Sequence, residues 1–184
     1  GGSALVNITP DLTYAEYARR GFFELVAVVA LMLPLLLLAD WLLRRDGPRD
    51  ERAFRALAGV QVVLVLAVLV SALQRLRLYQ GVFGLTESRL YASAVLLLAG
   101  VVLLWFSATV LRGRREQFAT GVLLAVLTTG AVLYAVNPDA IIVRTNVARV
   151  HATADEAVRF DALYAASLSA DAVPELVSAL PSLP

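Results

Sequence analysis

The chain has 184 residues, 59% of them hydrophobic, and a formal net charge of +1, with a mean hydropathy of +0.74. A water-soluble domain of this length carries far fewer apolar residues. The absence of cysteine excludes disulfides and thiolate metal sites, and a single histidine excludes a histidine-based metal cluster within one chain. No basic run is interleaved with aromatic residues, so we predict no nucleic-acid partner, and all 16 basic residues are arginine.

The first part of the chain, residues 1–21, is predicted to lie at a membrane interface. Tyr14, Tyr17, Arg19 and Arg20 form an aromatic and basic collar of the kind found at headgroup depth. The chain starts at Gly1, and the apolar run that follows is too long for a cleavable signal peptide. We therefore interpret the sequence as a fragment of a longer protein.

Residues 22–136 contain four long apolar stretches. A helix rises about 1.5 Å per residue, so about 20 apolar residues cross a hydrocarbon core of roughly 30 Å. The last three stretches contain no charged residue. We predict an all-α fold, an integral membrane bundle of four transmembrane helices, with spans 22–43, 56–73, 90–111 and 118–136.

The connections between the spans differ in character. Residues 44–55 carry five arginines around Gly47 and Pro48 and indicate a short polar hairpin, and residues 112–117 form a tight turn with three arginines. The segment Gln74–Arg89 mixes basic, aromatic and glycine residues and is predicted to be a loop resting on the interface. Thr86 is the expected N-cap of the third span.

Residues 137–184 are predicted to be a helical extramembrane tail. Asn137 precedes Pro138 as an N-cap precedes a first-turn proline. Thr153 and Glu156 have capping-box spacing, and a further short helix is expected from Ser169 or Asp171 through Leu180. Such helices lie on the membrane surface or pack on a partner.

Orientation follows from the basic residues near the spans. The segments 44–55 and 112–117 share one side of the membrane and hold eight arginines, against seven on the opposite side. We predict these two segments in the cytoplasm because they are short and densely basic.

Four strings of the sequence resemble a family of bacterial multi-pass inner-membrane proteins named only as a domain of unknown function, of the kind numbered 4173 or 4153. They are TYAEYARRGFFEL from Thr13, RLRLYQGVFGLTESRLYA from Arg75, NPDAIIVRTNVAR from Asn137 and YAASLSADAVPEL from Tyr164. The resemblance implies an all-helical protein of the bacterial inner membrane, of which this chain is a C-terminal-half fragment. It implies no activity, substrate, cofactor or catalytic residue.

Charged residues at the membrane boundaries are the candidates for function, since charge within a bilayer is costly. Asp40 is expected to form an interfacial ion pair with Arg44, one helical turn later. On the opposite face, a cluster of arginines and carboxylates could hold an anionic lipid headgroup or a phosphorylated carrier. The same charges could instead only pair with each other and hold the segments together. The cluster comprises Glu16, Arg20, Glu24, Arg75, Arg77, Glu87 and Arg89.

Two functions therefore stay open. The first is a non-enzymatic membrane scaffold or interaction module, which contacts the bilayer and other membrane-protein segments or subunits. The alternative is part of a transporter or lipid-handling protein that binds an anionic headgroup at the outer face. No nucleophile elbow, phosphate-binding loop or zinc-binding HExxH motif occurs in the sequence, so we name no catalytic, cofactor-binding or metal-binding residue.

Overall fold

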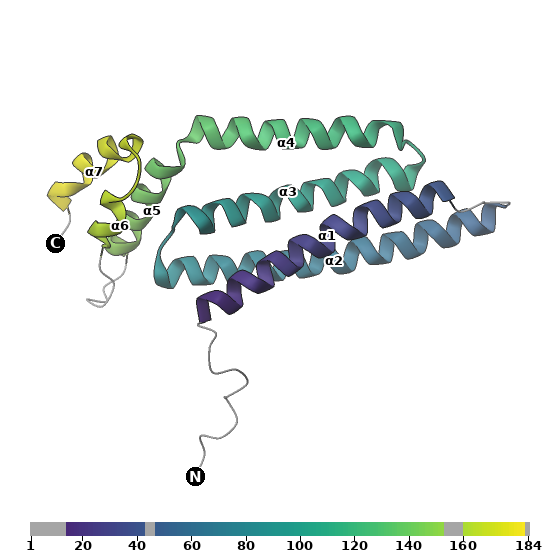
Figure 1. Cartoon of the computed structure of the whole chain (residues 1–184), viewed down its shortest axis with the longest axis horizontal. Coiled ribbons are helices and arrows are strands. Elements are labelled where there is room, and N and C mark those ends of the chain that lie inside the picture. The colour runs from purple at the N-terminus through teal and green to yellow at the C-terminus, as the bar shows by residue number, and fades with distance from the viewer. Residues whose placement is uncertain (1–13, 43–46, 153–159, 183–184) are drawn as a thin grey trace, which may run out of the picture.

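The computed structural model describes residues 14–42, 47–152 and 160–182, and every secondary-structure element in these ranges is helical (Figure 1). Residues 1–13 of the predicted interfacial segment, the expected Asp40 partner Arg44, and the Thr153–Glu156 capping box lie outside these ranges. The long helices are α1 (Tyr14–Leu42), α2 (Pro48–Phe83), α3 (Glu87–Thr109) and α4 (Glu116–Val136). The shorter helices are η1 (Val110–Arg112), α5 (Pro138–Ala152), α6 (Ala162–Ala166), η2 (Ala170–Ala172), α7 (Val173–Ala179) and η3 (Leu180–Ser182).

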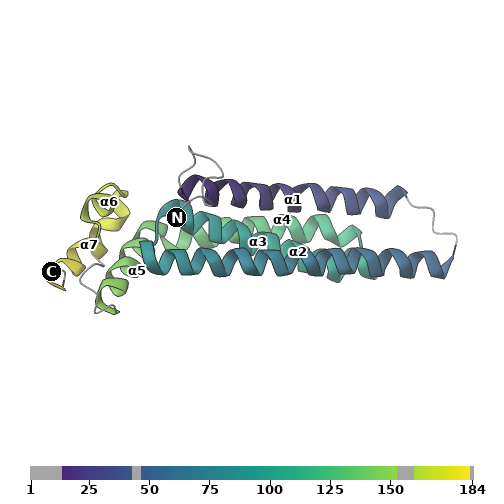
Figure 2. The ribbon, with the colours of Figure 1, turned by 90° about the horizontal axis from the view of Figure 1, so that it is seen from below.

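The four long helices lie side by side, and the tail helices gather at one end of them (Figures 1 and 2). Each of the four is long and apolar enough to cross a membrane. A helix satisfies its backbone hydrogen bonds internally, as it must in lipid, because lipid tails offer no hydrogen-bonding partners. The prediction of an all-helical chain with four helices of membrane-spanning length is therefore confirmed.

Helix α3 is at the centre of the packing, and its buried face meets α1 and α2. Leu103 and Phe106 of α3 are fully buried in the core. Leu96 of α3 belongs to the same core, which also contains residues of α1, α2 and η1, namely Val29, Met32, Val62, Leu69 and Val110. Helix α4 packs on the other side of α3, where the Phe118 ring meets Phe106 edge to face at 5.7 Å between centroids.

The outer surface of the bundle is apolar. Leu31, Leu64 and Leu127 expose 66%, 61% and 60% of their surface, and none of the residues of α4 is buried. A water-soluble bundle of this size would place such side chains inside. Exposed apolar surface of this kind is typical of helices that face hydrocarbon.

Helix α2 is longer than the predicted second span, and the interfacial loop expected at Gln74–Arg89 is wrong over most of its length. The helix has 36 residues, about 54 Å at the usual rise. Pro48 begins it, and Leu76 continues its packed face beyond residue 73. It ends only at Gly84, whose φ of 79° favours glycine. The connection to α3 is three residues long, and Thr86 is at the predicted N-cap position of α3, although its side chain makes no capping hydrogen bond there.

The two arginine-rich segments lie at the same end of the bundle, at the far end from the tail. There the Arg115 guanidinium lies 3.4 Å from a carboxylate oxygen of Asp40. Asp40 is buried, with 9% exposure, whereas Arg115 is exposed. Among the described residues, an ion pair at Asp40 therefore joins α1 to the α3–α4 turn, while the expected partner Arg44 lies outside these residues.

Candidate functional site

The described members of the predicted charge cluster come from the halves of α1, α2 and α3 that are nearer the tail (Figure 1). Glu24 on α1 and Glu87 on α3 are exposed, as are Arg75 and Arg77 on α2. The helix α1 also contains Glu16 and Arg20, but their side chains lie outside the described residues. Among the described residues, neither Arg75 nor Arg77 makes a hydrogen bond or an ion pair through its side chain.

Arg89 has a different role from the other arginines of the cluster. Its guanidinium donates hydrogen bonds to the backbone carbonyls of Phe83, at 3.1 Å, and of Gly84. Its guanidinium carbon lies 4.6 Å from the centroid of the Tyr79 ring, a cation–π arrangement. A cation beside the last carbonyls of a helix also stabilises the helix dipole. Arg89 thus holds the α2–α3 turn together through backbone carbonyls and an aromatic ring.

The α2–α3 turn is bound by an asparagine of the tail. Asn146 on α5 accepts a hydrogen bond from the backbone nitrogen of Leu85 at 2.7 Å and donates one to the Leu85 carbonyl at 2.8 Å. Leu85 is buried, so these backbone groups would otherwise lack partners. A Cβ on Gly84 would lie 2.8 Å from the Asn146 amide oxygen. The turn therefore needs glycine both for its backbone angle and for the approach of Asn146.

Two further tail residues contact the same turn. Arg149 on α5 donates to the Val82 carbonyl at 2.8 Å, and the Tyr164 hydroxyl accepts from the Glu87 backbone nitrogen at 2.9 Å. Burial of the phenol raises the pKa of Tyr164 above its ordinary value, although the hydrogen bond from Glu87 lowers it. We call these contacts, from Asn146, Arg149 and Tyr164 to the backbone of Val82, Leu85 and Glu87, the tail–turn clasp.

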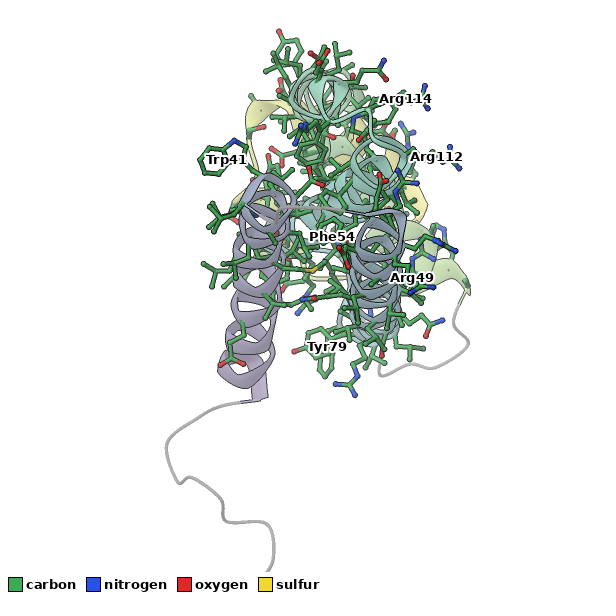
Figure 3. All side chains as sticks on the ribbon, turned by 90° about the vertical axis from the view of Figure 1, so that its right-hand side faces the viewer. Trp41, Arg49, Phe54, Tyr79, Arg112 and Arg114 are labelled. Atoms are coloured by element: carbon green, nitrogen blue, oxygen red, sulfur yellow. The ribbon has the colours of Figure 1, made fainter. Side chains whose placement is uncertain are left out.

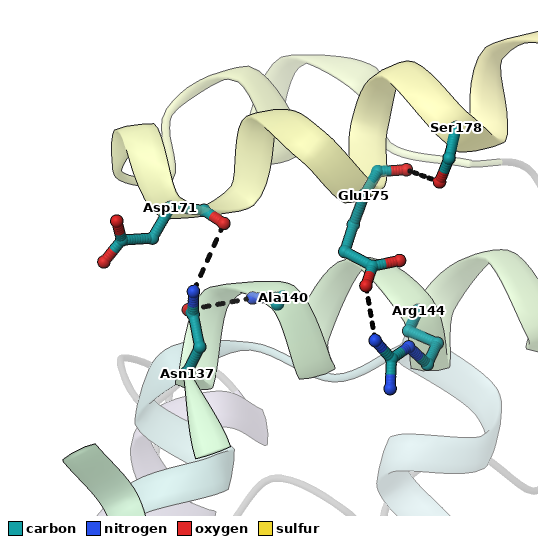
Figure 4. A network of polar contacts seen from close by, with 6 residues as sticks. All are labelled: Asn137, Ala140, Arg144, Asp171, Glu175 and Ser178. Carbon is teal, nitrogen blue, oxygen red and sulfur yellow. Dashed lines mark hydrogen bonds and ion pairs between the residues drawn. The ribbon is translucent and has the colours of Figure 1, made fainter. Parts of the chain in front are cut away.

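The tail helices are also tied to one another (Figure 4). Asn137 caps α5 by accepting from the Ala140 nitrogen at 3.3 Å, as predicted, and donates to the Asp171 carbonyl at 3.3 Å. Arg144 on α5 forms an ion pair with Glu175 on α7, and this hydrogen bond raises the pKa of Arg144.

Asp139 forms a second link between the tail helices. It is buried, with 7% exposure, and its carboxylate accepts from both the nitrogen, at 3.1 Å, and the hydroxyl of Ser169. Ser169 in turn caps η2, in agreement with the predicted start of a short helix there. The tail is therefore a packed unit attached to the bundle at the α2–α3 turn.

The contacts of the tail–turn clasp position the tail helices against the α2–α3 turn. Within the described ranges, no three His, Cys, Asp or Glu side chains are grouped so as to hold a metal ion. The three residues of the tail–turn clasp were not singled out from the sequence, although they lie within two of the strings that carry the family resemblance. The Gly-Leu-Thr turn was a signal, but nothing local identifies the asparagine 61 residues away that binds it.

The chain matches one family model, described as Domain of unknown function (DUF4153), over residues 1–179. No curated protein and no solved structure matches it. The matched range includes all four long helices and both sides of the tail–turn clasp. The chain therefore belongs to the family Domain of unknown function (DUF4153).

Proposed function

We propose that this chain is a non-enzymatic integral membrane module, which fixes a folded tail at one end of a four-helix bundle for contact with another protein segment. The observation that carries this proposal is the tail–turn clasp. Three tail side chains are engaged with the backbone of Val82, Leu85 and Glu87, and residues 56–73, 90–111 and 118–136 contain no charged residue that could serve transport.

An apolar stripe on the tail supplies a surface for such a contact. Val173, Val177 and Leu180 expose 51%, 60% and 65% of their surface. Their spacing places them along one side of α7 and its continuation into η3. Neighbouring apolar side chains left in water favour association. The partner we propose is a segment or subunit of a membrane protein.

Copurification in mild detergent tests this proposal. The wild-type chain should retain a specific protein, and Val177→Glu should lose it because a charge would enter the apolar contact. Thr145→Glu is the matched control, since it places the same charge at an exposed position of α5, away from the stripe. A monomer without any partner, or a partner retained equally by Val177→Glu, would count against the module.

The location we propose is the bacterial inner membrane, with residues 44–55 and 112–117 in the cytoplasm. The described parts of both segments, residues 47–55 and 112–117, lie at one end of the bundle (Figure 1), and arginines favour the cytoplasmic side. Because the chain has no native cysteine, a single cysteine at Arg114 can be tested alone. It should resist a membrane-impermeant thiol reagent added outside intact cells and react after the cells are opened. Labelling from outside would reverse the orientation.

A second candidate function is recognition of an anionic lipid headgroup at the outer face. Arg75 and Arg77 favour it, because they are exposed at the boundary of the apolar region and make no side-chain hydrogen bond among the described residues. Arg75→Gln with Arg77→Gln should reduce copurified anionic lipid. Unchanged lipid content would remove this candidate. Arg89 is unsuitable for the test because it caps the α2–α3 turn.

A further inference from the structure

An apolar groove runs between α3 and α4 on the side of α3 that faces away from the core. Its volume is about 730 Å³, within the size range of small-molecule binding sites. Trp105 and Ala108 of α3 line it, as do Gly121 and Leu124 of α4. Gly121 lies so close to the indole that a Cβ there would be 1.9 Å from its nitrogen. The groove lies within the apolar segments of both helices.

The α3–α4 turn closes one end of this groove, where Glu116 and Gln117 contribute to the lining. The turn is a Schellman motif: the Arg114 nitrogen donates to the Thr109 carbonyl at 2.8 Å, and the Gly113 nitrogen to the Val110 carbonyl at 3.0 Å. The φ of Gly113 is 77°, which favours glycine at this position. The motif fixes the backbone on both sides of Gly113.

The three arginines of the turn differ in their side-chain contacts. Arg115 pairs with Asp40, whereas the Arg112 and Arg114 side chains are exposed and make no hydrogen bond or ion pair among the described residues. Figure 3 shows both side chains on the side of the bundle opposite Trp41. They outnumber the one carboxylate at the mouth, Glu116. Neither arginine lines the groove itself, but both belong to the turn that closes it, and residues 112–117 carry a net positive charge.

We propose that this groove binds an anionic phospholipid, with an acyl chain along the α3–α4 groove and the phosphate at Arg112 and Arg114. An apolar channel open to lipid suits the chain, and two guanidinium groups at the bilayer boundary suit the phosphate. Each arginine near an anionic headgroup favours it by roughly five-fold at low salt. This site is at the opposite end of the bundle from Arg75 and Arg77, so it does not depend on the proposed headgroup cluster there.

The two tryptophans of the chain report on this site separately. Trp105 lines the groove, and its indole nitrogen donates to the Gln117 carbonyl at 3.3 Å. Trp41 is exposed by 73% on α1, on the side of the bundle opposite Arg112 and Arg114 (Figure 3). Trp41→Phe leaves only the groove reporter, and Trp105→Phe leaves only the reporter on α1.

The test uses the full chain in bilayers that mix phosphatidylcholine with phosphatidylglycerol, with bromine on the acyl chains of one lipid at a time. Bromine quenches tryptophan fluorescence on contact, so the quenching ratio gives the local preference for each lipid. Trp105 should show a several-fold preference for the anionic lipid, and Trp41 a preference close to one. In the Trp41→Phe background, Arg112→Gln with Arg114→Gln should bring the preference at Trp105 close to one.

Three results would overturn the site. They are no anionic preference at Trp105, an equal preference at Trp41, and a preference that survives both arginine substitutions. Arg112 and Arg114 are exposed, so their replacement should leave folding intact, which the gel-filtration profile checks. A further measurement needs no arginine variant: raising the ionic strength should reduce the preference at Trp105, because salt screens an exposed phosphate contact. A preference that is independent of salt would also contradict the proposal.

Discussion

Replacing Asn146 by alanine removes the two hydrogen bonds that join α5 to the α2–α3 turn. The Leu85 nitrogen and carbonyl then lose partners at 2.7 and 2.8 Å, in a residue that is only 7% exposed. A buried backbone group without a partner costs about 1–3 kcal/mol. Since water reaches part of the opened turn, we expect the clasp to be destabilised by roughly 2–4 kcal/mol in total.

Hydrogen exchange of the peptide that contains Leu85 measures this change directly. A loss of about 2 kcal/mol makes opening roughly 30-fold more frequent, so the Leu85 amide should exchange at least that much faster in Asn146→Ala. The assay is mass-detected exchange of the full chain in detergent or nanodiscs. Peptides from the middle of α3 should keep the wild-type rate, because the clasp does not contact them.

Thr145→Ala is the matched control, as it truncates an exposed neighbour on the same helix. Its exchange at Leu85 should equal that of the wild-type chain. If Asn146→Ala also exchanged at the wild-type rate, the two hydrogen bonds would contribute nothing to holding the turn, and the clasp could not be the attachment of the tail.

Three other predictions follow from single contacts. Gly121→Ala should lower the free energy of unfolding by about 1–3 kcal/mol, because the added Cβ would meet the indole of Trp105 on α3. In the same thermal denaturation assay, Gly130→Ala should be neutral or stabilising, because a Cβ there would have nothing within 4 Å. Equal effects of the two substitutions would refute the close approach of Gly121 to the indole. Asp40→Asn should lower the free energy of unfolding by about 1 kcal/mol through loss of the ion pair with Arg115. The loss is small because the Arg115 side chain is largely exposed, so that solvent screens the pair. An unchanged melting temperature would contradict this prediction. The raised pKa of Tyr164 means that the folded state holds its proton more tightly, so the stability it contributes is complete below about pH 10 and is lost as pH rises through the folded pKa. Tyr164→Phe should remove this alkaline loss of tail protection, and a persistent loss would assign it to another group.

The sequence was sufficient to predict the four long helices and several of their ends. Uninterrupted apolar runs of this length leave few alternatives to a helix, and Asn137 is at the start of α5, where its side chain caps the first turn. Thr86 precedes α3 as expected, but without a side-chain capping hydrogen bond. The extent of α2 was mispredicted because arginine and tyrosine at residues 75–79 were interpreted as an interfacial loop. Arginine is a good helix former, and Leu76 continued the packed face.

The contacts between distant segments could not be predicted from the sequence. One partner of Asp40, Arg115, is 75 residues away, and local spacing could indicate only Arg44. Arg89 belonged to the predicted charge cluster, yet its position just after a glycine turn directs it to the carbonyls that end α2. Asn146 has no feature within α5 that distinguishes it from a surface asparagine. Its role depends on the packing of the tail against the turn.

The central claim is that the apolar surfaces of the long helices face hydrocarbon, and cysteine labelling tests it most directly. The chain has no cysteine, and Leu64 in the middle of α2 exposes 61% of its surface. In membranes opened to both sides, Leu64→Cys should not react with a membrane-impermeant maleimide until a denaturing detergent is added, while Thr145→Cys on the tail should react at once. Labelling of Leu64→Cys in the intact bilayer at the rate of Thr145→Cys would show that this surface faces water and would contradict the membrane assignment.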